Sequence, residues 1–281
     1  MKDMSTEKKL VDCLKEFAVF AGNLALPYYG KIERQNKLVG VAEHLHESPV
    51  TVVDHGIQEM VLSELIRNGF TNLAFNGEEE THLKFFFKGD YSNGLVVHCD
   101  PIDGTKAFVN GKNRFAVGFA LSRVKNNVHD FFATIVYSPI DQQLFWSYED
   151  KASKHVKQSL VSRELASVRL LTNEGKDCLS QKGYVPAPPE SMHLSIIDTA
   201  LGKRAAVTGY HVEAHDAFIP FAFARNYGIT PYTHAGKKLK KIILEPTPKG
   251  YRTMHKVYYF ANNEIRDELL PVFQNAKYVN K

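Results

Sequence analysis

The chain has 281 residues, of which 44% are hydrophobic and 23% are charged, close to the averages for folded globular proteins. This composition excludes a chain that is disordered throughout, and a formal net charge of +4 does not by itself indicate a nucleic-acid-binding protein. The three cysteines are too widely spaced for a zinc motif or a disulfide framework, which favours free thiols in a reducing compartment.

Two amphipathic helices are predicted in the first 70 residues. Apolar side chains recur at helical spacing from Leu10 to Tyr29 and again from Thr51 to Asn68. The polar segment between them, Glu33 to Ser48, is expected to be a loop. Residues Met1 to Lys9 lack the apolar core of a signal peptide, and no apolar run approaches the roughly 20 residues of a membrane span. These features predict a cytoplasmic protein without a membrane segment.

The strands expected next end in acidic residues. Asn72 to Phe75 leads into Gly77-Glu78-Glu79, and Gly94 to Cys99 leads into Asp100-Pro101-Ile102-Asp103-Gly104-Thr105. Alternating side chains from Arg114 to Glu149 predict an antiparallel meander of further strands. Because α/β enzymes often place their chemistry at the ends of apolar strands, the two acidic runs are the first candidates for a site.

The second half of the chain mixes short strands and helices. A polar stretch at 150–158 separates it from the first half. We therefore predict two lobes, an α+β lobe over residues 1–150 and an α/β lobe over residues 151–281. The expected strands of the second half are Val168–Leu171, Ala205–Val207 and Lys241–Leu244, and the expected helices are Ser191–Leu201 and Asp216–Tyr227.

The run from Asp100 to Thr105 carries the strongest chemical signal. Two carboxylates three residues apart at the end of a buried strand can face one point, and Gly104 allows the backbone to approach a ligand closely. Thr105 is expected to begin a short helix whose free N–H groups suit a phosphate. Hard oxygen ligands favour Mg²⁺, which commonly partners phosphate. Taken alone, the run is equally compatible with a capped turn whose carboxylates are solvated.

Three further acidic positions accompany this run. Glu78 and Glu79 precede it by about twenty residues, Asp54 lies at the start of the second helix, and Asp216 opens an apolar helix. Each has a simpler interpretation, a solvated acidic loop for the glutamates and a helix cap for the aspartates. The order VTxxD, GEE, DPIDGT and a helix-opening aspartate is far more specific than any one of them.

In that order the sequence resembles the inositol monophosphatase superfamily of magnesium-dependent, lithium-sensitive phosphatases. The resemblance implies a layered αβαβα sandwich, two or three Mg²⁺ ions, and hydrolysis of a small phosphate ester by direct attack of metal-activated water. It also implies residue roles: metal binding by Glu78, Asp100, the carbonyl of Ile102, Asp103 and Asp216, with Glu79 nearby or on a third ion; water activation by Asp54 and Thr105; and phosphate binding by Gly104, Thr105 and Lys106.

The substrate is less well defined by the sequence. A lysine after the threonine, here Lys106, is typical of the 3′(2′),5′-bisphosphate nucleotidase branch, so 3′-phosphoadenosine 5′-phosphate is the first substrate expected. An inositol phosphate is the alternative, and a catalytically weak phosphate-ligand sensor is an alternative of another class. The substrate half departs from the family pattern. His215 replaces a tryptophan, Ser191-Met192-His193 replaces a Gly-Ser pair, and Gly209 stands where inositol monophosphatases have an acidic residue.

The remaining features point to no additional cofactor. The twelve histidines show no ligand spacing, so none is assigned to a metal, and His215 is expected to serve in packing. The basic run from Lys237 to Lys241 is interpreted as a solvated surface segment, with an anion-steering rim or an RNA or lipid contact as alternatives. The expected partner is a small phosphorylated substrate, with neither a nucleic-acid polymer nor a membrane, and the family resemblance implies a homodimer.

Overall fold

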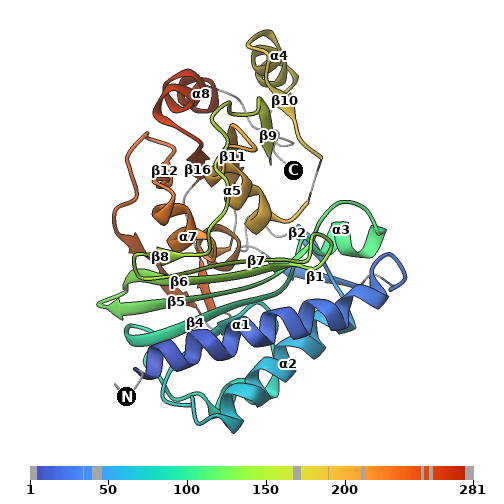
Figure 1. Ribbon diagram of the computed structural model, residues 1–281, viewed down its shortest axis with the longest axis vertical. Helices are drawn as coiled ribbons and strands as arrows, with labels where there is room; N and C mark the ends of the chain where they lie inside the picture. The colour runs from blue at the N-terminus through green and yellow to red at the C-terminus, as the bar shows by residue number, and fades with distance from the viewer. Residues whose placement is uncertain are drawn as a thin grey trace.

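The computed structural model describes residues 5–33, 35–39, 46–166, 172–188, 190–209, 213–247, 250–252 and 256–275. Its elements stack in five layers, helices alternating with sheets, which confirms the predicted αβαβα sandwich (Figure 1). The outer helices of one side are α1 (Thr6–Ala25) and α2 (Val52–Arg67); the middle layer holds α5 (Met192–Ala200), α6 (Ala214–Phe218) and α7 (Phe221–Asn226); the far side carries α4 (Asn173–Gln181) and α8 (Asn263–Asn275).

The first sheet has seven strands and supports most of the acidic residues. β3 and β4 run parallel, and the strands from β4 through β8 pair antiparallel in chain order. Of these, β5, β6 and β7 are the meander predicted from Arg114 to Glu149. Asn126 and Asn127 make the turn between β5 and β6 with φ of 51° and 61°, a left-handed conformation that asparagine tolerates. The strands are β3 (Ala74–Gly77), β4 (Asn93–Asp103), β5 (Ala116–Lys125), β6 (Val128–Ser138), β7 (Gln143–Tyr148), β8 (Lys151–Ala152) and β13 (Ile242–Ile243).

Helices α1 and α2 cover one face of this sheet through an apolar stripe. Leu10, Leu14, Phe17 and Ala21 fall on one side of α1 and are buried against β5 and β6. Ser5 begins α1 by accepting a hydrogen bond from the Lys8 N–H at 3.3 Å. Both predicted N-terminal helices are thus confirmed, with the last turn of the first one continuing as a 3₁₀ helix at Leu26–Tyr28.

The second sheet has five strands and lies between the middle helices and the α4/α8 layer. Its order is β10, β9, β11, β16 and β12, of which β11 and β16 are antiparallel neighbours. The aromatic residues Tyr258 and Phe260 of β16 pack against Phe273 of α8. The strands are β9 (Glu164–Ala166), β10 (Val185–Pro186), β11 (Ala206–Gly209), β12 (Tyr232–Thr233) and β16 (Val257–Phe260).

Helix α5 is enclosed between the two sheets. All nine of its residues are buried, and it contacts β5 and β6 on one side and β11 and β16 on the other. Two of its hydroxyl side chains are accommodated by hydrogen bonds to the main chain of the preceding turn, as Ser195 donates to the Ser191 carbonyl at 2.8 Å and Thr199 donates to the Ser195 carbonyl at 2.9 Å. The N-terminus of α5 points toward the end of β4, and this arrangement positions the candidate site.

Several expectations need correction. The helix predicted from Asp216 to Tyr227 is two helices, α6 and α7. Pro220 interrupts it because proline has no main-chain N–H to donate within a helix. The expected loop from Glu33 to Ser48 contributes two paired strands, β1 (Gln35–Val39) and β2 (His46–Val50), whose main-chain pairing needs no apolar alternation. The strand expected at Val168–Leu171 lies outside the described residues.

Other elements were not foreseen or belong elsewhere than expected. The strand predicted at Lys241–Leu244 is β13, and it pairs with β6 of the first sheet although it lies in the second half of the chain. Helices α4 and α8 were not predicted. The remaining elements are the 3₁₀ helix η2 (His82–Phe86) and the paired strands β14 (Glu245–Thr247) and β15 (Gly250–Arg252). Within the described ranges, no helix combines the length and apolar character needed to cross a bilayer.

Candidate active site

The parallel pairing of β3 and β4 brings the two acidic runs together. Gly77 is paired with Cys99, and the Glu78 N–H donates to the Cys99 carbonyl at 3.1 Å. Glu78, which directly follows β3, therefore lies at the same level as Asp100 within β4. The pairing of β4 with β5 shifts register between Asp100 and Asp103. This irregularity allows both aspartates to face the middle layer, because regular alternation would turn residues three apart to opposite faces.

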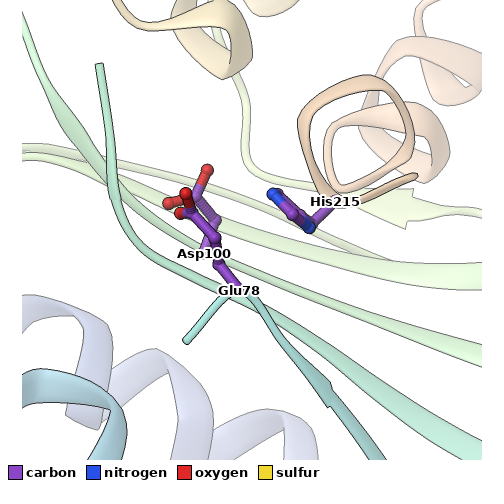
Figure 2. Close-up of side chains that lie close together, drawn as sticks. All are labelled: Glu78, Asp100 and His215. Atoms are coloured by element: carbon purple, nitrogen blue, oxygen red, sulfur yellow. The ribbon is translucent and has the colours of Figure 1, made fainter. Parts of the chain in front are cut away.

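Two overlapping groups of side chains form the centre of the site. Potential ligand atoms of Glu78, Asp100 and His215 lie within 4.8 Å of one another, and the same holds for Asp100, Asp103 and His193. Figure 2 shows the carboxylates of Glu78 and Asp100 side by side, with the His215 ring facing them from α6. Asp100 belongs to both groups, so it occupies the middle of the cluster.

Asp103 is fixed by the N-terminus of α5. One of its oxygens accepts from the Met192 N–H at 3.0 Å, and the other accepts from the His193 N–H at 2.7 Å and from the Ser191 hydroxyl. The positive end of the helix dipole further favours a carboxylate at this position. A carboxylate has about four lone-pair positions, so these three hydrogen bonds leave room for one further ligand.

Asp100 has the property expected of a cation ligand. The residue is 1% exposed, and its Oδ1 atom has no hydrogen-bond partner among the described residues. Because a buried carboxylate oxygen without a partner is costly, a divalent cation fits this position.

Burial and mutual repulsion raise the pKa values of the cluster. Burial raises the pKa of Asp100 well above its ordinary value, and the nearby charges of Glu78 and Asp103 add to this effect. Burial also raises the pKa of Asp103 to about 6, against the hydrogen bonds from α5, which lower it. Burial raises the pKa of Asp216 as well. Bound cations favour the charged forms, so the same residues that resist ionisation alone suit a metal centre.

Asp216 lies beside the cluster on α6. Its carboxylate accepts from the Glu213 N–H at 3.1 Å, which closes a capping box at the start of the helix. Its side chain is 32% exposed, more than any of the other aspartates of the site. The helix expected to open at Asp216 therefore begins two residues earlier, with Glu213 as its N-cap and Asp216 in its first turn. The charge of Asp216 raises the pKa of Asp100.

Asp54 and Thr105 face each other at the edge of the cluster. The Thr105 hydroxyl lies 3.4 Å from Asp54 Oδ1 and 2.9 Å from the Ile102 carbonyl, which is the closer of its two acceptors. The other oxygen of Asp54 accepts from the Thr51 N–H at 2.8 Å and from the Thr51 hydroxyl at 2.5 Å, forming a capping box at the start of α2. Burial and the charge of Glu78 raise the pKa of Asp54 to about 7.

The remaining predicted residues occupy different surroundings. Glu79 is buried, exchanges main-chain hydrogen bonds with the Gln58 amide at 2.5 and 2.9 Å, and has its carboxylate 3.7 Å from His55. Thr105 begins the predicted short helix, α3 (Thr105–Asn110), while Lys106 is exposed on it.

Gly104 connects this turn to α5. It has a φ of 87°, and a Cβ atom there would lie 2.9 Å from the Ser191 nitrogen, so only glycine fits. The closest contact of this glycine is therefore the start of α5.

Two members of the site were missed in the sequence. No histidine was assigned to the metal because none shows ligand spacing, yet His193 and His215 both lie within the carboxylate cluster. His193 is fully buried on the first turn of α5, and His215 is 8% exposed on α6. Both depart from the family pattern, and that departure was the only signal of their location available in the sequence.

Comparisons with known proteins point to one family. A family model described as "Inositol monophosphatase family" matches residues 7–185, more than half of the chain. Among curated proteins, a fructose-1,6-bisphosphatase/inositol-1-monophosphatase of Aquifex aeolicus (strain VF5) is 27% identical over 145 residues, which cover 51% of this chain and 48% of that relative. The match therefore spans about half the length of that relative.

Solved structures of low sequence identity share the fold. The Thermotoga maritima IMPase superposes with a TM-score of 0.71 at 18% identity, covering 94% of this chain and 96% of that one. An IMPase/NADP phosphatase complexed with NADP and Ca²⁺ gives a TM-score of 0.76 at 14% identity, covering 99% of this chain and 100% of that one. The extragenic suppressor protein of Bartonella henselae gives 0.70 at 18% identity, covering 95% and 99%.

Proposed function

The chain belongs to the inositol monophosphatase family, and from this membership we propose that it is a metal-dependent phosphatase that hydrolyses a small phosphate monoester. The observation that carries the proposal is the buried carboxylate cluster centred on Asp100, one of whose oxygens has no hydrogen-bond partner among the described residues. Such a cluster costs free energy unless a cation binds there. Phosphate ester hydrolysis is among the reactions that most need this concentration of charge.

The proposed cation ligands lie at the ends of β3 and β4 and on α6. Glu78, Asp100, Asp103 and Asp216 supply carboxylates, and Ile102 supplies a main-chain carbonyl; Glu79 lies close enough to Asp54 for its charge to raise the pKa of that residue, and is proposed to help a third, weaker ion. When bound, Mg²⁺ ions supply polarisation of the phosphate and stabilise negative charge on the leaving oxygen. The hydrogen bonds from α5 hold Asp103 in a fixed orientation for this purpose.

Asp54 and Thr105 are proposed to orient the attacking water and accept its proton. The pKa of Asp54, raised to about 7, lies where a general base is most effective near neutral pH. The Thr105 hydroxyl can rotate so that it donates its hydrogen bond to Asp54, 3.4 Å away, in place of the Ile102 carbonyl. Its oxygen then accepts a hydrogen bond from water. Asp54 is held for this role by both hydrogen bonds from Thr51.

The substrate phosphate is proposed to bind at the turn between β4 and α3. The first N–H groups of a helix have no partner within the helix, so Gly104 and Thr105 can present main-chain donors to an anion. Lys106, exposed on the first turn, is close enough in sequence to contribute a positive charge. The first substrate proposed is 3′-phosphoadenosine 5′-phosphate, on the basis of this lysine.

An inositol phosphate is the second candidate, and fructose 1,6-bisphosphate is a third. The name of the Aquifex aeolicus relative contains both activities, although the match covers only half of that protein. A phosphate-ligand sensor with weak catalysis is the candidate of another class. The distance of 3.4 Å between the Thr105 hydroxyl and Asp54 Oδ1 favours an enzyme, since a sensor does not need to activate water.

Phosphate release by the purified protein tests the proposal. The panel contains 3′-phosphoadenosine 5′-phosphate, inositol 1-phosphate, inositol 1,4-bisphosphate and fructose 1,6-bisphosphate, each with Mg²⁺ and with or without Li⁺. We expect turnover that requires Mg²⁺ and disappears in Asp100→Asn, with one substrate clearly preferred. Stabilisation by a phosphate ester without phosphate release would favour the sensor. Light scattering of the same preparation tests the expected homodimer.

A further inference from the structure

The ring of His193 lies inside the carboxylate cluster. His193 is fully buried, with Nδ1 3.4 Å from Asp103 Oδ2 and Nε2 3.7 Å from Asp100 Oδ2. Its ring fills the space beside Gly118, where a Cβ atom would lie 2.5 Å from the ring. A bulkier residue on β5 would therefore displace the imidazole from the cluster.

The hydrogen bonds of His193 define which nitrogen is available. Nε2 lies 3.1 Å from the His215 main-chain carbonyl, which can only accept, so Nε2 carries the hydrogen. Nδ1 then has a lone pair, and it has no hydrogen-bond partner among the described residues. Histidines that bind metals commonly donate their other ring N–H to a carbonyl or carboxylate in this way. His193 is therefore held in the tautomer and orientation of a metal ligand.

The placement of the residues agrees with a shared cation. His193 Nδ1 lies 3.4 Å from Asp103 Oδ2, which already accepts two hydrogen bonds from the start of α5, so the remaining lone-pair position of Asp103 is on Oδ1. The second buried atom without a partner, Asp100 Oδ1, belongs to the same group of three residues. Two orphaned atoms of different chemistry, one nitrogen and one oxygen, thus occur in one cluster.

The second group repeats this composition. Glu78 and Asp100 supply two carboxylates, and the imidazole of His215 faces them from α6 (Figure 2). Asp100 is common to both groups. The main chain of His215 also orients His193, so the two histidines are coupled through the bond between Nε2 and the carbonyl.

We propose that the centre is a mixed nitrogen–oxygen site with two cation positions, each formed by two carboxylates and one imidazole, which prefers a first-row transition-metal ion such as Mn²⁺ to Mg²⁺. Mg²⁺ prefers oxygen ligands and retains its waters, whereas imidazole binds transition metals more strongly. The inference rests on the proposed metal site and concerns the identity of the ion. It assigns to His193 and His215 a binding role that the sequence did not indicate.

Pulsed electron paramagnetic resonance of the Mn²⁺-loaded full-length protein tests this role without reference to activity. We expect modulation from a directly bound nitrogen, and a changed coupling when all histidines carry ¹⁵N. Calorimetry is expected to show that His193→Asn weakens Mn²⁺ binding roughly 10- to 100-fold while Mg²⁺ binding changes by less than about threefold. The matched control is His129→Asn, which should leave both affinities unchanged. His129 is also buried but lies at the start of β6, whereas the His193 ring contacts Gly118, which pairs with Val136 near the end of β6.

The outcomes separate this inference from the proposed function. Absence of nitrogen modulation in the wild-type protein would overturn the inference, even if Mg²⁺-dependent phosphate release is intact. Equal loss of Mn²⁺ and Mg²⁺ affinity in His193→Asn would also overturn it, since the histidine would then act only through packing. The isotope measurement needs no variant, so a failure of His193→Asn to fold leaves the test decisive. Failure of any cation to bind would overturn both proposals.

Discussion

Asp100 and Asp103 lie three residues apart on one strand, but their surroundings predict different effects of their substitution on the free energy of unfolding. Asp103 accepts three hydrogen bonds from the start of α5, whereas Asp100 is buried with one oxygen that lacks a partner among the described residues. Both are proposed cation ligands. Removing either charge should abolish cation-dependent activity, but only one of the two changes should also weaken the fold.

We expect Asp103→Asn to lower the free energy of unfolding of the metal-free protein by about 1–3 kcal/mol, because one oxygen must replace two as the acceptor for α5. Asp100→Asn should leave the free energy of unfolding unchanged or raise it above neutral pH, since it removes a buried carboxyl whose ionisation is unfavourable. Urea unfolding in EDTA, beside a phosphate-release assay, measures both. Equal destabilisation by the two changes would contradict this distinction.

Asp54 predicts a pH dependence of stability in the metal-free protein. Burial and the charge of Glu78 raise its pKa from 3.8 to about 7. A carboxyl with a raised pKa in the folded state stabilises folding while it stays protonated, and that stability is lost as pH rises from about 4 to about 7. Asp54→Asn removes this loss. The free energy of unfolding of the variant minus that of wild type should therefore rise across that range and then level off after a rise of about 4 kcal/mol or less. A difference that does not vary with pH would exclude this effect.

At the scale of elements, residues at the starts of three helices fix three aspartates of the site by hydrogen bonds. Thr51 begins α2 and fixes Asp54, Ser191 begins α5 and bonds to Asp103, and Glu213 begins α6 and bonds to Asp216. The aspartates of the first and third pairs complete capping boxes, while Asp103 lies on a strand and caps a helix distant in sequence. The simpler interpretation of Asp54 and Asp216 as helix caps is therefore compatible with their proposed functional roles.

Thr51→Val should affect both stability and catalysis. The loss of the N-cap is expected to cost about 1 kcal/mol. The Thr51 hydroxyl also lowers the pKa of Asp54, so its removal should raise that pKa and shift the acidic limb of the pH–activity profile to higher pH. Ser5→Ala, which removes the cap of α1, is the matched control. It should cost similar stability and leave the pH profile in place, and a shift in both variants would argue against a specific effect.

Local patterns predicted most of the first half of the chain. Helices α1 and α2, the strands β3 and β4, and the meander follow from local side-chain patterns, although β4 continues past its predicted end at Cys99 to Asp103. Pro220 stands inside the predicted Asp216–Tyr227 helix, so the division of that helix into α6 and α7 has a local signal in the sequence. The pairing of β13 with β6 could not be predicted, because only the tertiary fold brings these segments together.

In the candidate site, the carboxylates could be predicted from the sequence and the histidines could not. The carboxylates form a recognisable motif because their spacing along each strand is local. His193 lies in the cluster for a different reason, since its position depends on where α5 enters between the sheets. No local spacing encodes that placement. The assignment of residues to the two lobes stays a prediction.

At the scale of the whole molecule, a buried ion network fixes α5 relative to the first sheet. Arg114 donates to Glu190 at 2.8 Å and also to Asp198, and Arg204 pairs with the same Glu190. The Ser191 N–H donates to the Arg114 carbonyl at 3.2 Å, so main chain and side chain act together. The side chains of Glu190 and Asp198 are only 7% and 6% exposed. The position of Asp103 therefore depends on charges outside the site.

We expect Arg114→Met to destabilise the protein by about 3–5 kcal/mol, because it leaves the two buried carboxylates of Glu190 and Asp198 to share the single charge of Arg204. The control is Arg225→Met, which removes an exposed pair with Asp130 and should cost less than about 1 kcal/mol. Thermal unfolding measures both. If the network also positions α5, Arg114→Met should reduce turnover at temperatures where the variant remains folded. Turnover equal to that of wild type would restrict the network to a stabilising role.

The bond between Asp103 and Ser191 joins residues 88 positions apart in the chain. Contacts of such separation close a long loop, and their entropy cost is recovered only when most of the surrounding structure is already in place. We therefore expect the cluster to be completed late in folding, after both sheets and α5 have assembled. A chain still emerging during synthesis holds Asp54, Glu78 and Asp100 before it contains Ser191, and so it lacks the finished centre. Cation binding then reports that folding has finished, and an incompletely folded chain gains little protection from the ion.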